Sequence, residues 1–265
     1  MGRSIYYGQK SHIAYSTRDN LGALTEVVAD PTTITDITDH SQALKSADLT
    51  RLAQVTSIQT DLNPDQEEII YPFSYKKISK IDARIGKTRK IDLRYTIVQF
   101  AEILLDHNDL LNTFLQPVLP WSVVNFAIYN SQIYDTLNLS NLEIRGATTI
   151  ASNDFLEGIT FNPSIGYAYM TSLNLSNNKQ LRYVDFKDLH GMLTPANSQI
   201  NIKDIGSSTA QIDLMLEEIN LRVYSGNPGR VFDMTGAFMA APSAAGIVFK
   251  NKILAKGIDI RTNNP

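Results

Sequence analysis

The segments of this 265-residue chain that could do chemistry are few, and the first of them resembles part of a nucleotide site. Gly86-Lys87-Thr88 has the ending of a phosphate-binding loop, in which backbone N–H groups and a lysine hold phosphate oxygens. That loop also needs an earlier glycine, and the chain has Ile81 at its position. We therefore interpret the segment as a basic turn after a strand.

A second candidate is a calcium loop at Asp61, Asn63 and Asp65, which have the spacing of the first ligands of an EF-hand. That loop needs a glycine directly afterwards to turn the chain, and a closing glutamate that supplies two oxygens. Gln66 and Pro72 occupy those positions here. An ordinary Asn-Pro turn explains the segment, and the sequence predicts no metal and no cofactor.

Side chains that act in catalysis are present, but they do not form a catalytic pattern. The chain has no cysteine, which removes thiolate nucleophiles, thiolate zinc sites and disulfides together. The adjacent acids Glu217 and Glu218 show no separation that would suit glycoside hydrolysis. We expect a protein that is not an enzyme. Four histidines are scattered without metal-ligand spacing, at His12, His40, His107 and His190.

Composition and charge indicate a folded protein with no general affinity for nucleic acids or membranes. Hydrophobic residues make up 43% of the chain, charged residues make up 19%, and the formal net charge is −3. Such a small net charge gives no bulk attraction to phosphate backbones or anionic lipids. The longest apolar run, Ile97 to Leu105, is too short to span a bilayer and is interrupted by Gln99 and Glu102.

The elements that would position functional residues begin with a predicted β-hairpin. Its arms, Ser79–Ile85 and Lys90–Val98, alternate in side-chain type and are joined by a turn at Gly86. Only Asp82 and Asp92 oppose eight basic residues in and beside the hairpin, which gives a net charge of +6. The predicted assembly interface is this basic set: Lys76, Lys77, Lys80, Arg84, Lys87, Arg89, Lys90 and Arg94.

Three roles are open for the basic hairpin. It can be a solvated face without a partner. It can dock on a neighbouring subunit of a homo-oligomer, because nine acids between Glu26 and Glu68 face only Lys45 and Arg51, a net charge of −7. It can contact nucleic acid, although few aromatic residues for base stacking lie between its cations. Docking is the hypothesis that we carry forward.

Residues 97–129 are predicted to form a helical cap and linker. Val98, Ala101 and Leu104 fall on one face of a helix, and two prolines end the pattern. The open end of a repeat stack exposes apolar surface and needs such a cap. The predicted organisation is a β-rich anchoring and assembly domain over 1–96, the cap over 97–129, and a leucine-rich-repeat-like domain over 130–265.

Short strands of the type apolar–polar–apolar recur in this last domain. Alternation over three residues buries one face only if neighbouring strands cover the backbone edges, so these strands predict a stack. Met170–Asn178 fits the leucine-rich-repeat template throughout, and its asparagine can hydrogen-bond the turn that leaves the strand. The uneven spacing indicates a degenerate solenoid, with either one longer strand or a tight corner at Leu137–Ile144. The predicted strands are centred on Asn138, Glu143, Thr160, Asn174, Asp185, Asn201, Asp233 and Asp259.

Two helices are predicted between the last strands, in right-handed parallel crossovers. Ser207-Ser208 supplies an N-cap for the first, and Pro242-Ser243 begins the second, which ends at Gly257. The predicted fold class is α+β or α/β: a β-rich N-terminal domain, then an irregular leucine-rich-repeat-like solenoid ending in two β-α units. The apolar stripe of the first helix is Ile212, Met215, Leu216, Ile219 and Val223, and the stripe predicted on one side of the second is Ala244, Ile247, Val248, Asn251, Leu254 and Ala255.

Residues 137–263 resemble leucine-rich-repeat proteins. The ending from Pro242 to Asn263 is similar to the closing repeat of such ladders in bacteriophage and prophage proteins. In that repeat a turn with glycine and proline precedes an Ala-rich helix, and a Lys-Gly step, here Lys256-Gly257, leads into a last strand. The first hundred residues resemble no family.

This resemblance implies a non-enzymatic structural component of a bacteriophage virion, located in the tail, the baseplate or the head. The N-terminal domain would serve assembly, and the ladder would contact other virion proteins. The alternative is a bacterial or phage surface adhesin or receptor-binding protein that holds a host protein or glycan on the ladder. A third possibility, a glycan hydrolase, would need two acids at working distance.

Overall fold

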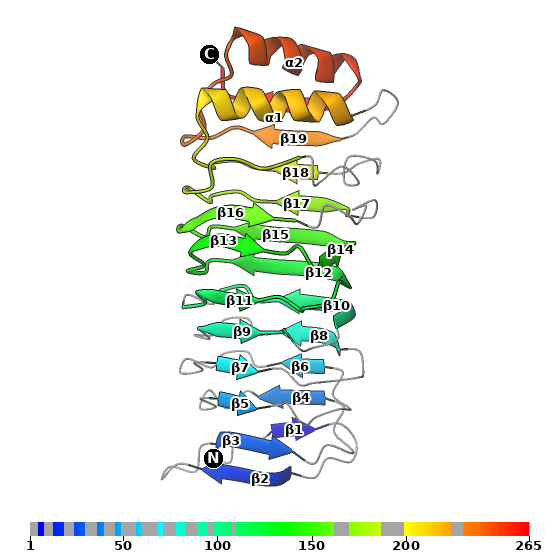
Figure 1. The fold of residues 1–265 in the computed structure, drawn as a ribbon, viewed down its shortest axis with the longest axis vertical. Coiled ribbons are helices and arrows are strands. Elements are labelled where there is room, and N and C mark those ends of the chain that lie inside the picture. The colour runs from blue at the N-terminus through cyan, green and yellow to red at the C-terminus, as the bar shows by residue number, and fades with distance from the viewer. Residues whose placement is uncertain are drawn as a thin grey trace. The chain divides into compact units, whose positions relative to one another are not determined.

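The computed structural model describes the strands up to residue 100 by their backbone (Figure 1). It describes, with side chains, residues 80–81, 89–94, 101–107, 110–161, 170–186, 199–223 and 230–264. The chain divides into two compact units, Met1–Ile133 and Tyr134–Pro265. The fold is a parallel β-solenoid over residues 80–201, followed by two β-α units.

The first unit is built from strands that alternate between two sheets as the chain advances. One sheet has the order β1-β4-β6-β8-β10-β12, and all its neighbours run parallel except β1 and β4. The other has the order β11-β9-β7-β5 and is wholly parallel. The antiparallel pair β2 and β3 stands apart from both. From β8 onward each turn of the chain adds one strand to each sheet, and this part of the unit belongs to the solenoid.

Most of these strands are short. They are β1 (Ile5–Tyr7), β2 (Ile13–Arg18), β3 (Leu24–Ala29), β4 (Asp36–Asp39), β5 (Ser46–Asp48), β6 (Ser57–Gln59), β7 (Glu68–Ile70), β8 (Ile78–Asp82), β9 (Lys90–Asp92), β10 (Val98–Leu104), β11 (Thr113–Leu115) and β12 (Trp121–Tyr129).

The core of the first unit lies between its two sheets. Ile103 of β10 is fully buried, and so is Ile91 of β9. Phe114 of β11 and Phe126 of β12 pack edge to face, with 5.6 Å between their ring centroids. These rings join the two sheets, because β11 and β12 belong to different ones.

The second unit contains one parallel sheet, a short two-stranded sheet and two helices. The parallel sheet has the order β15-β17-β18-β19-β20, and β13 pairs in parallel with β16. The strands are β13 (Asp135–Asn138), β14 (Leu142–Ile144), β15 (Ala147–Ala151), β16 (Leu156–Thr160), β17 (Ser172–Asn174), β18 (Gln199–Asn201), β19 (Val231–Met234) and β20 (Asp259–Thr262), and the helices are α1 (Thr209–Arg222) and α2 (Ala244–Ala255).

The predicted helical cap over residues 97–129 is wrong, because this segment forms the strands β10, β11 and β12. The apolar residues of β10 also fit a period of two. Ala101 and Ile103 are buried, whereas Glu102 and Leu104 are half-buried. Pairing with β8 and β12 on either side decided between the two periods.

The predicted basic hairpin is also wrong. β8 pairs in parallel with β6 and β10, whereas β9 pairs in parallel with β7 and β11 in the other sheet. The sequence of each arm alternates, but the strand beside each arm comes from an adjacent turn of the solenoid. Alternation within a strand carries no information about which strand lies beside it, so the glycine turn misled the prediction.

Most predicted strands of the second unit are confirmed, within a residue or two, and the parallel arrangement is confirmed for β17 to β20. Val184–Phe186 is the exception, since it forms no strand. Leu137–Ile144 is a tight corner, because β13 ends at Asn138 and the Leu142 N–H then donates to the Leu139 carbonyl at 2.9 Å. The repeat is that of a β-solenoid, and in the described part of the chain the two helices belong to the β-α units that follow it.

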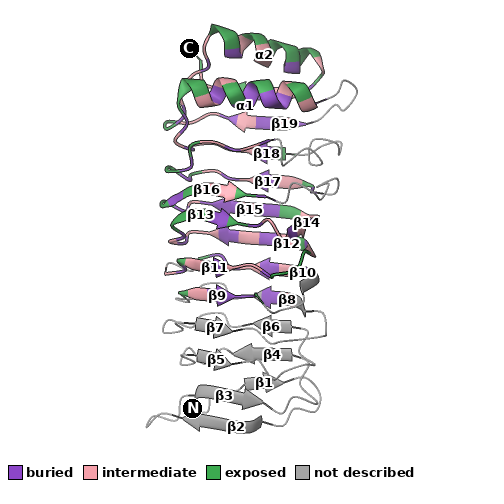
Figure 2. Ribbon diagram, viewed as in Figure 1, coloured by how far each residue is buried: buried purple, intermediate pink, exposed green. Residues whose placement is uncertain are grey.

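Both predicted helices are confirmed with their caps. Ser208 is the N-cap of α1, Ser243 is the N-cap of α2, and Gly257 has a φ of +81° beyond the end of α2. The predicted stripe of α1 is buried. The stripe predicted for α2 is wrong: Val248 and Leu254 are exposed, and Gly246 and Ile253 are the buried positions (Figure 2).

Candidate functional site

The open surface of the sheet β17-β18-β19-β20 carries two rows of side chains, which we call the polar face. Parallel pairing aligns the first residues of these strands in one row and the third residues in a second row. The first row is Ser172, Gln199, Val231 and Asp259, and the second row is Asn174, Asn201, Asp233 and Arg261.

The central residue of each strand points away from the polar face and into the core. Leu173, Ile200, Phe232 and Ile260 occupy these central positions, and each is at most 3% exposed. Successive side chains of a strand point to opposite sides, so burial of these four residues places both rows outward. Phe232 also packs edge to face against Phe186 at 6.2 Å.

Three residues of the second row also hold the turn that leaves their strand. The Asn174 side-chain oxygen accepts from the backbone N–H of Ser176 (3.1 Å), and that of Asn201 accepts from the N–H of Lys203 (3.1 Å). Asp233 accepts from the N–H of Thr235 at 3.2 Å. Each side chain thus satisfies a backbone donor two residues ahead, as Asx-turns do.

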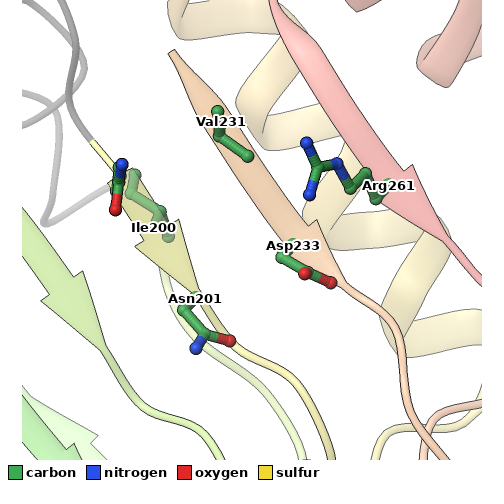
Figure 3. Close-up of a pocket in the computed structure, with 6 residues that line it drawn as sticks. Ile200, Asn201, Val231, Asp233 and Arg261 are labelled. Carbon is green, nitrogen blue, oxygen red and sulfur yellow. The ribbon is translucent and has the colours of Figure 1, made fainter.

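A hollow of about 260 Å³ lies on the polar face over the last three strands. Figure 3 shows Asn201, Asp233 and Arg261 beside it, on β18, β19 and β20 respectively. The Arg261 guanidinium donates to Asp259 at 2.6 and 3.0 Å, and this hydrogen bond raises the pKa of Arg261. The hollow therefore offers amide groups, a carboxylate and a guanidinium to whatever binds there.

A buried asparagine holds the corner that follows β17. The Asn178 amide donates to the carbonyls of Ile150 (2.6 Å) and Leu175 (2.7 Å), and its oxygen accepts from the N–H of Asn153 (2.9 Å). Asn178 and Asn153 are both fully buried. This confirms that the asparagine of the leucine-rich template hydrogen-bonds the turn backbone, and it adds that two of its partners, Ile150 and Asn153, are on the previous turn.

Comparison with known proteins identifies no relative. No protein-family model matches the chain, no curated protein is detectably similar to it, and no solved structure matches its fold.

The basic residues predicted as an assembly interface are only partly described. Lys80 lies in β8, Lys90 lies in β9, Arg89 precedes β9 and Arg94 follows it. Since β8 and β9 belong to different sheets, these residues do not share one hairpin face. The remaining four, Lys76, Lys77, Arg84 and Lys87, lie outside the described residues.

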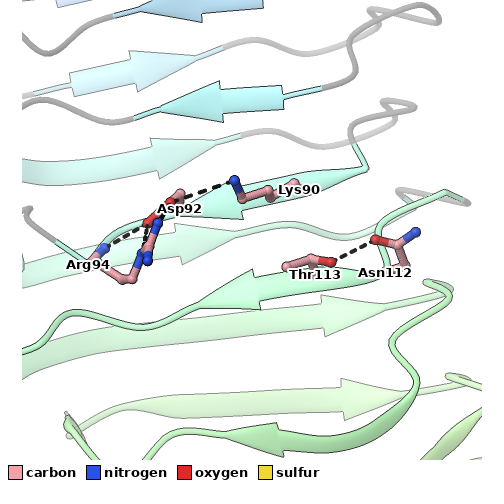
Figure 4. A network of polar contacts seen from close by, with 5 residues as sticks. All are labelled: Lys90, Asp92, Arg94, Asn112 and Thr113. Carbon is pink, nitrogen blue, oxygen red and sulfur yellow. Dashed lines mark hydrogen bonds and ion pairs between the residues drawn. The ribbon is translucent and has the colours of Figure 1, made fainter.

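Two of these basic residues surround one acid. Arg94 donates to Asp92 through Nη2 (2.7 Å) and Nε (3.0 Å), and Lys90 Nζ lies 3.8 Å from the same carboxylate (Figure 4). The Arg94 hydrogen bond holds the pKa of Asp92 below its ordinary value, against the opposing effect of burial. The charges of Arg94 and Lys90 are therefore directed partly at Asp92 within this chain.

In residues 80–81, 89–94 and the later described ranges, no group of three or more histidines or acids is placed to hold a metal ion. Neither α1 nor α2, the helices of the described chain, is long and apolar enough to cross a membrane.

The sequence showed that these strands carry polar residues at Asn174, Asn201 and Asp233, but it did not show why these residues are polar. The pattern that could have shown it is the residue two positions later, which is Ser176 after Asn174, Lys203 after Asn201 and Thr235 after Asp233. A side-chain acceptor followed at that distance by a turn is typical of an Asx-turn.

Proposed function

We propose that this chain is a non-enzymatic structural component of a bacteriophage virion, belonging to the tail, the baseplate or the head. In this proposal the polar face binds a neighbouring virion protein, and the N-terminal region takes part in assembly as a homo-oligomer. The partners are therefore other virion proteins, and the chain is located in the virion.

The polar face is the observation that carries the contact role. Its two rows repeat hydrogen-bonding side chains at the spacing of parallel strands, about 4.8 Å. Their turns are held by side-chain hydrogen bonds, so the surface is preorganised and loses little freedom on binding. In the first row Val231 lies between Gln199 and Asp259. It adds an apolar contact to the hollow. Such a surface suits a protein partner.

The virion role rests on the resemblance of the last repeat to closing repeats of phage ladders. The residues of that resemblance have defined structural tasks in this chain. Ser243 caps α2, and Gly257 supplies the left-handed residue beyond its end. Asn263 donates to the carbonyls of Gly236 (2.8 Å) and Met239 (2.5 Å), so it ties the final strand to the preceding corner.

The contact role is tested by site-specific photo-crosslinking of the full chain. A photo-reactive residue replaces Val231 on the polar face or, as a control, the exposed Val248 on α2. We expect crosslinks to a virion protein from position 231 and none from position 248. Crosslinks to a host surface protein at 231 would favour the adhesin alternative, and equal crosslinking from both positions would refute a specific polar face.

The virion role is tested separately by mass spectrometry of purified particles of the phage that encodes the chain. We expect the chain to be present at a fixed copy number in relation to the other structural proteins. Absence from the particles would refute the virion role even if the polar face binds a partner.

A further inference from the structure

Exposed aromatic side chains line one edge of the second unit, where corner loops follow the strands of successive turns. We call this set the aromatic edge; it consists of Tyr134, Phe155, Phe238, Asp154 and Lys179. Its three rings are 49%, 45% and 53% exposed respectively. The rings lie on the corner loops after β12, β15 and β19. A group of exposed large apolar side chains needs an explanation beyond the packing of this chain.

The members of the aromatic edge are in contact with one another. The ring centroids of Tyr134 and Phe155 are 4.9 Å apart, with 33° between the ring planes. Lys179 forms an ion pair with Asp154 at 3.2 Å. The same ammonium lies 5.8 Å from the centroid of the Phe238 ring. The pair of rings Tyr134 and Phe155, the ion pair of Asp154 and Lys179, and the ring of Phe238 therefore follow each other along the edge.

The loops that carry this edge are fixed from inside. Asn153, directly before Asp154, donates its N–H to the buried Asn178, which directly precedes Lys179. The loop of Phe238 is held by Asn263, whose oxygen accepts from the Gly236 N–H at 3.1 Å and whose amide donates to Met239. The rings thus sit on backbone that would not need to rearrange to receive a ligand.

We propose that the aromatic edge is a binding site for carbohydrate, in which sugar rings lie on the aromatic faces. The electron-rich face of an aromatic ring attracts the slightly positive C–H groups of a pyranose, and close packing adds dispersion energy. The hydroxyl groups at the rim of the sugar then need donors and acceptors beside the rings. Asp154 accepts from them and Lys179 donates to them.

Replacing the Lys179–Asp154 ion pair by hydrogen bonds to a sugar would cost little free energy, because the pair is exposed. The side chains of Lys179 and Asp154 are 47% and 59% exposed, and a surface ion pair of this kind stabilises a fold little. Its charged groups can turn to sugar hydroxyls and form charge-assisted hydrogen bonds, which are stronger than neutral ones. A protein partner would instead favour continuous apolar surface at the centre of its contact, and here an ion pair lies between Phe238 and the other two rings.

A glycan array probed with the labelled full chain tests the proposal, followed by calorimetric titration of the oligosaccharides that bind. We expect binding to a defined set of polysaccharide fragments. The double variant Tyr134→Ala/Phe155→Ala should weaken this binding at least tenfold, whereas Tyr134→Phe, which keeps the ring, should retain it within about threefold. Leu221→Ala is the matched control, because Leu221 is an apolar side chain, 67% exposed, on α1.

Circular dichroism of each variant checks the fold, since all three positions are exposed and their replacement should leave the thermal transition in place. If the double variant loses its fold, Phe238→Ala and Lys179→Met are measured in its place and should each weaken binding. Three outcomes would overturn the proposal: no oligosaccharide binds, Leu221→Ala weakens binding as much as the ring deletions, or the edge binds peptides only. None of them bears on crosslinking at Val231.

Discussion

The carboxylate of Asp213 on α1 accepts two hydrogen bonds from Ser243, the N-cap of α2. Its Oδ1 accepts from the Ser243 N–H at 2.9 Å, and its Oδ2 accepts from the hydroxyl at 2.5 Å. The Ser243 hydroxyl in turn accepts from the N–H groups of Ala245 and Gly246. One side chain of the first helix therefore organises the first turn of the second.

This relationship predicts that Gly246→Ala destabilises the protein. In an exposed helix the change would stabilise by about 1 kcal/mol. Here a Cβ at position 246 would stand 2.0 Å from Asp213 Oδ1. We expect a net loss of about 1–3 kcal/mol in the free energy of unfolding, measured by urea denaturation. In an Asp213→Ala background the same substitution should cost much less; an equal cost in both backgrounds would show that the contact is irrelevant.

Asn178→Asp should destabilise the corner after β17 strongly. The substitution keeps the shape but turns an amide that donates to the Ile150 and Leu175 carbonyls into an oxygen that faces them. We expect a loss of about 3 kcal/mol at neutral pH, partly recovered in acid as the buried carboxyl takes up a proton. Thermal unfolding followed by circular dichroism measures it. Asn177→Asp, at the exposed neighbouring position, should change stability by less than about 0.5 kcal/mol.

The ion pair of Asp92 and Arg94 predicts a pH dependence on the acid side. Because the Arg94 hydrogen bond lowers the pKa of Asp92 in the folded protein, its stabilisation is complete above the ordinary pKa of 3.8. It is lost as the pH falls through the folded value. Arg94→Gln should raise the pKa of Asp92 in an NMR titration of its carboxyl carbon. Lys90→Gln should raise it less, since Lys90 is 3.8 Å away; a larger effect of Lys90 would contradict the assignment.

Tyr183 predicts a pH dependence on the alkaline side. Burial raises the pKa of its hydroxyl, and Glu218 raises it further through a hydrogen bond and through its charge. A folded pKa above the ordinary 10.0 means that the neutral phenol stabilises the fold fully below that pH, and that this stabilisation fades at higher pH. Absorbance titration at the tyrosinate band should lose a group that ionises above pH 10.0 in Tyr183→Phe, and Glu218→Gln should move the ionisation of that group to lower pH.

The closing turns could be predicted from sequence because their determinants are local. Ser208 and Ser243 stand directly before their helices, and Gly257 stands directly after α2. The strands of the second unit alternate over residues that are adjacent in the chain. Each of these features can be recognised within a short window, without knowledge of what packs against it.

The first unit could not be predicted in this way. Val98 to Leu105 satisfies both the helical and the strand period, and only pairing with β8 and β12 decides between them. The basic arms alternate in sequence, but their partner strands lie one turn away, as the pairing of Ile81 with Ile103 shows. A parallel neighbour at such a distance leaves no mark in a local pattern.

The candidate sites divide along the same line. The polar residues Asn174, Asn201 and Asp233 were visible in the sequence, because each stands between two apolar residues of a short strand-like segment. The aromatic edge was not visible, since Tyr134 and Phe155 are far apart in sequence and meet only when the corners stack.

A hydrogen-bonded corner that recurs in the second unit limits where residues can be inserted or deleted in such a chain. Ser152, Asn177 and Asp204 each have a positive φ, and each donates its N–H to a carbonyl on the following turn, at 2.9, 2.8 and 3.0 Å respectively. The number of residues between these corners nevertheless differs from turn to turn. Length variation is thus confined to the rest of each circuit, while the corner keeps the turns in step. During evolution, the segments between the corners could therefore become longer and more varied without loss of the register of the sheet.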